Sequence, residues 1–143
     1  MTYSITTKSV DETITAGYDF AEKLKKDSVV LLYGEMGAGK THFVKGIALG
    51  LGIAETVTSP TFALVNDYHG KLCHFDLFRI HSHDDLYAIG FYDYIGNGVI
   101  AIEWAENIPE LKSEFDEYYT VSITKFLEKP ESQREINIDY LRT

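Results

Sequence analysis

Residues 34–41 form a glycine-rich motif that constrains the fold of this chain more than any other segment. The sequence Gly34-Glu35-Met36-Gly37-Ala38-Gly39-Lys40-Thr41 fits the pattern G-x-x-x-x-G-K-[ST]. The apolar run Val29-Val30-Leu31-Leu32-Tyr33 precedes it and has the composition of a buried strand. Residues 41–49 follow with apolar side chains at helical spacing. A strand, a glycine loop and a helix in this order indicate a binding site for a nucleoside triphosphate.

The chemistry of the motif assigns roles to its residues. Glycines let successive N–H groups, from Glu35 to Thr41, turn inward toward an anion, and the helix N-terminus adds its dipole. Lys40 is expected to reach the β- and γ-phosphates, and the Thr41 hydroxyl to ligate Mg²⁺. His42 is expected to offer its backbone amide to the α-phosphate, with its side chain toward solvent. A glycine-rich turn before an ordinary helix is the alternative. The nucleotide-binding residues predicted here are Gly34, Glu35, Met36, Gly37, Ala38, Gly39, Lys40, Thr41 and His42.

Length and charge set the frame for the rest of the chain. With 143 residues, of which 45% are hydrophobic, residues 1–143 are expected to form one P-loop domain around a single core. The net charge is −9, so a direct grip on the phosphates of a nucleic acid is not expected. No apolar run reaches the length of a membrane span. Cys73 is the only cysteine, which excludes an internal disulfide and favours a reduced, cytoplasmic setting.

Sequence patterns predict the remaining elements. Ser9 and Glu12 form a capping box that opens a helix running to about Lys26. A short helix is expected from Ser82 or Asp84 to about Ile89. Strands are predicted over residues 62–68, 71–76 and 99–102, and residues 118–126 and 135–140 form a hairpin that turns at residues 129–132. The predicted fold is α/β: a P-loop NTPase-like, three-layer domain with a mixed central sheet, flanking helices and a C-terminal antiparallel hairpin.

Two acidic residues stand where a magnesium site requires them. Asp76 ends the strand 71–76, and Glu103 follows the strand 99–102. Ligands of open α/β sheets lie at the carboxyl ends of the strands, where the glycine loop also lies. Either acid could hold Mg²⁺ directly or through water, and the other could orient the attacking water. The alternative is that Asp76 and Glu103 are ordinary solvated carboxylates at strand ends.

The absence of certain motifs helps to distinguish between possible nucleotides and reactions. The chain has no N-K-x-D sequence of the kind that reads guanine, which favours ATP. Its three arginines are Arg79, Arg134 and Arg142, and no arginine-bearing lid segment of the kind found in small kinases is evident. Slow hydrolysis that is accelerated by a partner is therefore expected. A small-molecule kinase and a nucleotide-dependent binding module remain the alternatives.

Three further motifs, in order along the chain, carry a family resemblance. They are Ser59-Pro60-Thr61-Phe62, His74-Phe75-Asp76-Leu77-Phe78-Arg79 and Ile102-Glu103-Trp104. Together with the glycine loop, these motifs resemble those of the bacterial TsaE (YjeE) family. The resemblance extends along the chain from the helix near Thr13 to Arg134. The resemblance implies an ATPase that binds ATP and Mg²⁺ and is required for N6-threonylcarbamoyladenosine in tRNA. It also implies that the chain acts on a pair of proteins, TsaB and TsaD, and meets tRNA only indirectly.

The same resemblance implies roles for single residues. Thr41, Asp76 and Glu103 would form the magnesium and catalytic shell around Lys40. Ser59 and Thr61 would belong to a switch loop that senses the γ-phosphate and the partner, so Thr61 is counted among the catalytic candidates. Trp104, which could otherwise be a core residue, would lie beside the nucleotide. Thr13 and Arg134 match positions near the adenine.

Overall fold

The computed structural model describes residues 2–60, 64–126 and 133–142. Its strands are β1 (Thr2–Thr7), β2 (Val29–Tyr33), β3 (Val65–Tyr68), β4 (Leu72–Asp76), β5 (Val99–Glu103), β6 (Glu117–Lys125) and β7 (Arg134–Arg142). The α-helices are α1 (Val10–Ala21), α2 (Lys40–Gly50) and α3 (His83–Ala88). Three 3₁₀ helices are η1 (Phe91–Asp93), η2 (Ala105–Asn107) and η3 (Pro109–Glu114). Among these residues no helix is long and apolar enough to cross a membrane.

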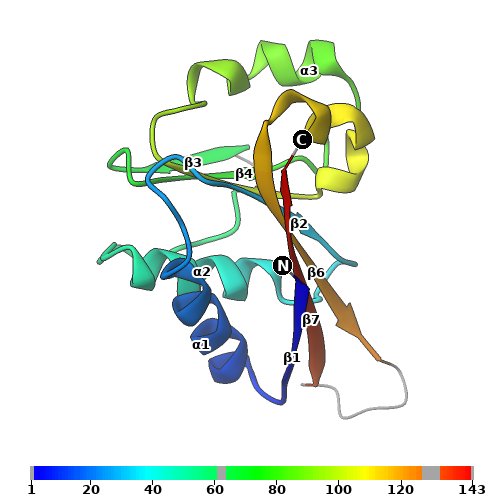
Figure 1. Ribbon diagram of the computed structural model, residues 1–143. Coiled ribbons are helices and arrows are strands. Elements are labelled where there is room, and N and C mark those ends of the chain that lie inside the picture. The colour runs from blue at the N-terminus through cyan, green and yellow to red at the C-terminus, as the bar shows by residue number, and fades with distance from the viewer. Residues whose placement is uncertain (1, 61–63, 127–132, 143) are drawn as a thin grey trace.

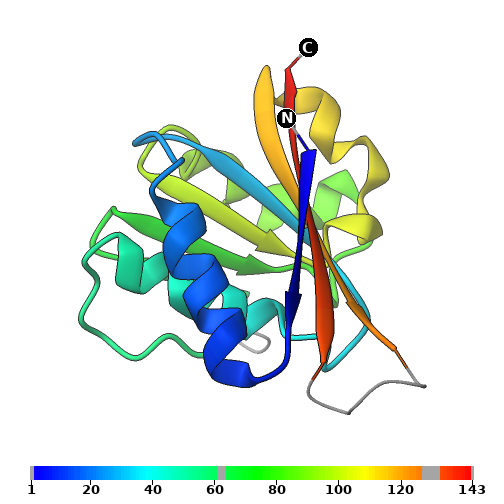
Figure 2. The same cartoon turned by 60° about the horizontal axis from the view of Figure 1, so that its bottom comes forward.

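The strands of the described chain form one seven-stranded mixed sheet in the order β1-β7-β6-β2-β5-β4-β3. Its centre is parallel, because β2 pairs in parallel with β5 and β6, and β4 pairs in parallel with β5. The antiparallel pairs are β3 with β4, β6 with β7 and β1 with β7. Figure 2 shows β1 alongside β7, so the two ends of the chain meet in the sheet. The predicted mixed sheet and C-terminal hairpin are confirmed.

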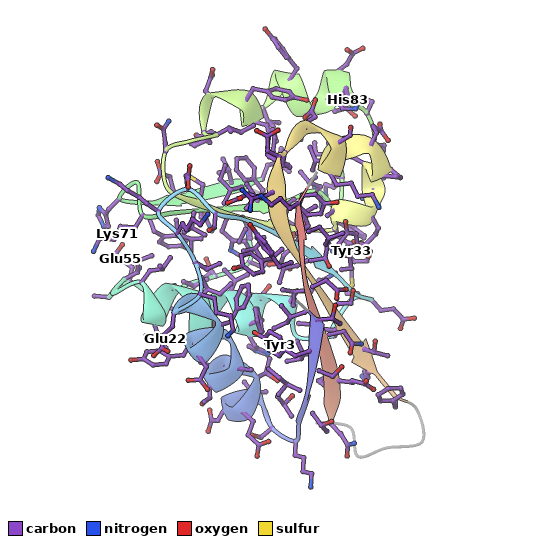
Figure 3. The ribbon with its side chains drawn as sticks, viewed as in Figure 1. Tyr3, Glu22, Tyr33, Glu55, Lys71 and His83 are labelled. Carbon is purple, nitrogen blue, oxygen red and sulfur yellow. The ribbon has the colours of Figure 1, made fainter. Side chains whose placement is uncertain are left out.

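Helices cover both faces of the sheet, which gives three layers (Figure 1). The strand β2 is buried on both faces, and its alternating side chains enter two cores. Val30 and Leu32 join the core under α1 and α2, whereas Val29 and Leu31 join the core under α3 and the 3₁₀ helices. Tyr3 packs against the first of these cores and Tyr33 against the second; both are labelled in Figure 3.

Helices α1 and α2 touch backbone to backbone. A Cβ atom built on Gly46 would lie 1.9 Å from the carbonyl oxygen of Ile14, and one on Gly17 would lie 2.1 Å from that of Phe43. Two helices can approach this closely only where glycine removes the side chain. This contact fixes α2, and with it the loop that precedes α2.

The structure corrects two predicted boundaries. The helix α1 ends at Ala21 and not near Lys26, because the chain then forms turns in which Leu24 N–H donates to the Ala21 carbonyl. Lys25 lies beyond the end of the helix and forms an ion pair with Glu117 at 2.9 Å. The strand predicted over 62–68 begins at Val65, although residues 61–63 lie outside the described chain. The predicted turn at 129–132 also lies outside the described residues.

Candidate functional site

The glycine loop joins the carboxyl end of β2 to the N-terminus of α2, as the sequence predicts. Gly37 and Gly39 adopt left-handed backbone angles, with φ of 78° and 112°, which glycine tolerates without strain. Gly39 stands at the N-cap of α2 and, as a glycine, has no side chain that could accept a hydrogen bond from the first amides of the helix. Unpaired amides and the helix dipole make this end of α2 suited to an anion such as a phosphate.

Lys40 is the buried cation of the site. Its side chain is almost fully buried, and Nζ donates a hydrogen bond to the Gly34 carbonyl. Nζ also lies 3.6 Å from the centroid of the Trp104 ring, in a cation–π contact. Burial lowers the pKa of Lys40, while the nearby carboxylates, led by Glu106, act in the opposite direction. The ammonium group is therefore poorly solvated and lies next to the amides that would receive a phosphate.

The two predicted acids lie side by side. Asp76 and Glu103 are register partners at the ends of the parallel strands β4 and β5, and each is only 3% exposed. Thr41 Oγ1 donates to Glu103 Oε2 at 2.9 Å. Asp76 accepts the Phe78 N–H at 2.8 Å on one oxygen, and Ser59 Oγ lies 3.5 Å from the other. The sheet register thus brings both carboxylates next to the loop hydroxyl.

A cleft of about 470 Å³ brings these groups together. It is lined by Met36, Gly37, Gly39, Lys40, Thr41, His42, Ser59, Asp76, Phe78, Glu103 and Trp104. The rings of Phe78 and Trp104 lie 5.0 Å apart and form one wall. His42 is partly buried at this cleft, and its pKa is lowered, chiefly by burial.

A larger hollow of about 630 Å³ lies elsewhere, where β2 and β6 begin, and Asp27, Glu117 and Arg142 are among its lining residues. The smaller cleft is the better candidate, since it contains the glycine loop and lies at the carboxyl ends of the parallel strands.

Within the glycine loop, Gly34, Glu35 and Ala38 are not among the residues that line the cleft. Two predicted nucleotide residues outside the loop, Thr13 and Arg134, do not line it either. The Thr13 hydroxyl lies 2.8 Å from that of Thr7, and the Thr13 methyl group packs 3.7 Å from where a Cβ of Gly39 would stand. Arg134 donates from Nε to the Ala38 carbonyl at 2.8 Å and from Nη2 to the Gly37 carbonyl at 3.3 Å. Both residues contact the loop from outside, and their place near the adenine stays a prediction. Thr61 lies outside the described residues.

Two residues for which the sequence predicts no role in the site, Glu106 and His74, also belong to it, although His74 stands in one of the motifs that carry the family resemblance. Glu106 Oε2 accepts the Gly34 N–H at 3.3 Å, because Trp104 takes a left-handed conformation with φ of 60° and turns the chain after β5 back toward the loop. His74 Nε2 lies 2.5 Å from Glu103 Oε2. A polar residue two positions before Asp76 in a buried strand was the signal for His74, whereas no local pattern indicates Glu106.

The donor set of the cleft suits Mg²⁺ bound together with phosphate. Among the described residues no three His, Cys, Asp or Glu side chains are grouped to hold a metal ion by themselves. Asp76, Glu103 and Thr41 supply only oxygen atoms, which Mg²⁺ prefers, and Mg²⁺ is ordinarily held by one or two carboxylates plus substrate phosphates. Two almost fully buried carboxylates beside one lysine also provide the negative charge that a divalent cation would neutralise.

The three-layer sheet and the glycine loop define a small α/β protein of the P-loop NTPase-like class, which implies nucleotide binding. Comparison with known proteins supports this class. The structure resembles the crystal structure of YdiB from Bacillus subtilis with a TM-score of 0.74 and 29% sequence identity, over 100% of this chain and 87% of that one.

The chain belongs to the TsaE family, since the model of that family, "Threonylcarbamoyl adenosine biosynthesis protein TsaE", matches residues 7–136. Two proteins named tRNA threonylcarbamoyladenosine biosynthesis protein TsaE are similar to it. The one from Treponema pallidum is 46% identical over 120 residues, which are 82% of this chain and 86% of the relative. The one from Aquifex aeolicus is 40% identical over 104 residues, 69% of this chain and 74% of the relative. The family places the chain in the biosynthesis of threonylcarbamoyladenosine in tRNA.

Proposed function

We propose that this chain binds Mg²⁺–ATP and hydrolyses it as a subunit required for N6-threonylcarbamoyladenosine at adenosine 37 of tRNAs that read codons beginning with A. It would act on the TsaB–TsaD pair, in the cytoplasm, and meet tRNA only through that pair. One observation carries this function: Lys40, Asp76 and Glu103 are each no more than 4% exposed and line one cleft with the glycine loop. We treat residues 1–143 as one ATPase domain, because β1 pairs with β7 across the sheet.

The loop and Lys40 would bind the triphosphate. The amides at the start of α2 would face the phosphate oxygens, and Lys40 would exchange its contacts with Gly34 and Trp104 for the β- and γ-phosphates. Arg134 would support the loop from outside by holding the carbonyls of Gly37 and Ala38. Trp104 and Phe78 would form an apolar wall beside the nucleotide.

Thr41, Asp76 and Glu103 would hold Mg²⁺, which supplies positive charge to the phosphate oxygens when bound. The Thr41 hydroxyl can offer a lone pair to a cation while still donating its hydrogen to Glu103. One of the two acids would ligate the cation and the other would orient the attacking water.

Partner stimulation fits the charges at the cleft. Among the described residues that line the cleft, Lys40 is the only lysine and there is no arginine. Arginine groups that stabilise the transferring phosphate often come from a second protein. Hydrolysis by the chain alone is therefore expected to be slow, and the partner pair would supply or order the missing groups.

Two other functions are tested against this one. A small-molecule kinase would form a phosphorylated product without the partner pair. A nucleotide-dependent binding module would lose function in Lys40→Ala but retain it in Glu103→Gln, because binding alone does not need the second acid.

The deciding experiment measures Mg²⁺–ATP hydrolysis by the purified chain, alone and with its cognate TsaB–TsaD pair. The variant Lys40→Ala serves as the blank. Slow turnover alone and clear stimulation by the pair support the proposed function. If a TsaB–TsaD pair that is shown to be competent gives no stimulation, the proposed function is contradicted. The release of free phosphate from ATP should then be compared with the transfer of phosphate to candidate metabolites.

A further inference from the structure

His74 lies fully buried in β4, beneath the cleft. It has no exposed surface, and its strand neighbours Cys73 and Phe75 are buried as well. Because side chains alternate along a strand, His74 shares its face with Asp76 and with Leu72, which belongs to the core under α1 and α2. A polar ring at such a position costs folding free energy unless its nitrogens are hydrogen bonded.

Only one ring nitrogen of His74 has a partner in the described part of the chain. Nε2 lies 2.5 Å from Glu103 Oε2, whereas Nδ1 is buried without a hydrogen-bond partner among the described residues. A carboxylate oxygen is the acceptor in this bond, so the hydrogen is on Nε2 and His74 donates it to Glu103. A buried ring of which one nitrogen lacks a partner among the described residues is poorly suited to stability alone, so the bond to Glu103 requires another explanation.

The bond holds Glu103 from the side of the sheet. Glu103 Oε2 accepts from His74 of β4 and, at 2.9 Å, from Thr41 of α2. Both donors go to the same oxygen, so the carboxylate is fixed between the strand and the helix. Oε1 is left without a hydrogen bond to these two residues and is the oxygen that remains for a cation or a water at the cleft.

We propose that His74 is a positioning residue, which donates Nε2–H to Glu103 and thereby orients that carboxylate toward the cleft. This inference rests on the proposed function, and it assigns to His74 no contact with nucleotide or metal. A carboxylate without this donor can rotate about its side-chain bonds. Groups that orient a metal-binding or water-orienting carboxylate in this way commonly contribute about 10- to 100-fold to activity or metal affinity.

Three substitutions separate the hydrogen bond from the packing of the ring. His74→Gln can place an amide N–H where Nε2 stands, whereas His74→Asn reaches only the Nδ1 position and His74→Leu fills the space without a donor. His74→Gln is expected to retain most of the partner-stimulated ATP hydrolysis. His74→Asn and His74→Leu are expected to lower kcat by about 10- to 100-fold, with little change in the affinity for ADP measured without Mg²⁺.

Thermal unfolding of the same variants distinguishes positioning from a merely structural role. His74→Leu removes the nitrogen that has no partner among the described residues and should unfold at a temperature no lower than that of the wild type, yet it should be impaired in hydrolysis. A His74→Leu variant that is both stable and fully active overturns the proposal. Equal loss of activity in His74→Gln and His74→Asn also overturns it.

Two measurements do not depend on hydrolysis. Long-range ¹⁵N–¹H spectra of the nucleotide-free chain should show a proton on Nε2 of His74, and a ring that carries its proton on Nδ1 alone contradicts the proposal. If the wild type proves to have no ATPase activity, the proposed function fails by itself. The role of His74 is then decided by how much Mg²⁺ increases the affinity for ADP. A smaller increase than in the wild type for His74→Asn and His74→Leu, but not for His74→Gln, supports the positioning role. Equal increases in the wild type and all three variants overturn it.

Discussion

The ammonium nitrogen of Lys40 lies 3.6 Å from the centroid of the Trp104 ring. Trp104 is the only tryptophan of the chain, so tryptophan fluorescence reports on the surroundings of this one ring, which include Lys40 and Phe78. A triphosphate in the glycine loop would draw Lys40 from the ring toward the phosphates. We expect Trp104 emission to change on titration with ATP and to saturate with the binding curve. An emission spectrum that does not respond to bound ATP, with binding verified by calorimetry, would show that Lys40 keeps its place on the ring.

Lys40→Ala should weaken ATP binding by about 10- to 100-fold, because a charge-assisted hydrogen bond contributes about 1.5–3 kcal/mol. Lys45→Ala, on the same helix but away from the cleft, is the matched control and should leave the affinity unchanged. Since burial lowers the pKa of Lys40, the affinity should also begin to fall at a lower pH than an ordinary lysine would allow. Calorimetric titrations at neutral and alkaline pH measure both effects, and equal affinities of Lys40→Ala and the control contradict the assignment of the loop.

Asp76→Asn and Glu103→Gln should impair hydrolysis far more than they impair binding of ATP. Each substitution keeps the shape of the side chain but removes a carboxylate that would hold Mg²⁺ or orient the attacking water, for which a loss of about 100-fold in kcat is expected. Steady-state hydrolysis with the partner pair and ATP affinity should be measured on the same preparations. If both variants hydrolyse ATP like the wild type, the two acids do not form the metal and catalytic shell.

Gly46→Ala should destabilise the chain without touching the cleft directly. Its new methyl group would lie 1.9 Å from the Ile14 carbonyl oxygen, so α1 and α2 must move apart, at a cost of about 1–3 kcal/mol. Leu49→Ala, three residues further along α2 and 54% exposed, should change stability by less than about 0.5 kcal/mol. Urea unfolding of both variants tests this difference, and equal midpoints would mean that the helices are not in backbone contact.

Cys73 should resist thiol reagents in the folded chain. Burial raises the pKa of its thiol to about 11, so the reactive thiolate is scarce at pH 8, and the side chain lies in β4 with almost no exposed surface. Alkylation by iodoacetamide should be slow for the native chain and fast once urea unfolds it. Rapid modification of the native chain would show that β4 opens readily.

The sequence by itself determined the glycine loop, the strand before it, the helix after it and the acids at two strand ends. These features are local: φ at Gly37 and Gly39, the run Val29–Tyr33 and helical spacing depend on residues a few positions apart. The start of α1 was also readable, because Ser9 accepts the Glu12 N–H as a capping box requires. Its end was not, since the turns after Ala21 lack a strong stop signal such as glycine or proline.

Only the tertiary structure decided which groups meet in the cleft. Thr41 and Glu103 are 62 positions apart, His74 and Glu103 are 29 apart, and Arg134 lies 96 positions from the loop carbonyl that it holds. The strand β1, which the sequence analysis missed, likewise exists through its pairing with β7 at the other end of the chain. Such contacts follow from strand order and register, which are set by how the whole sheet buries its two faces, and no local pattern encodes them.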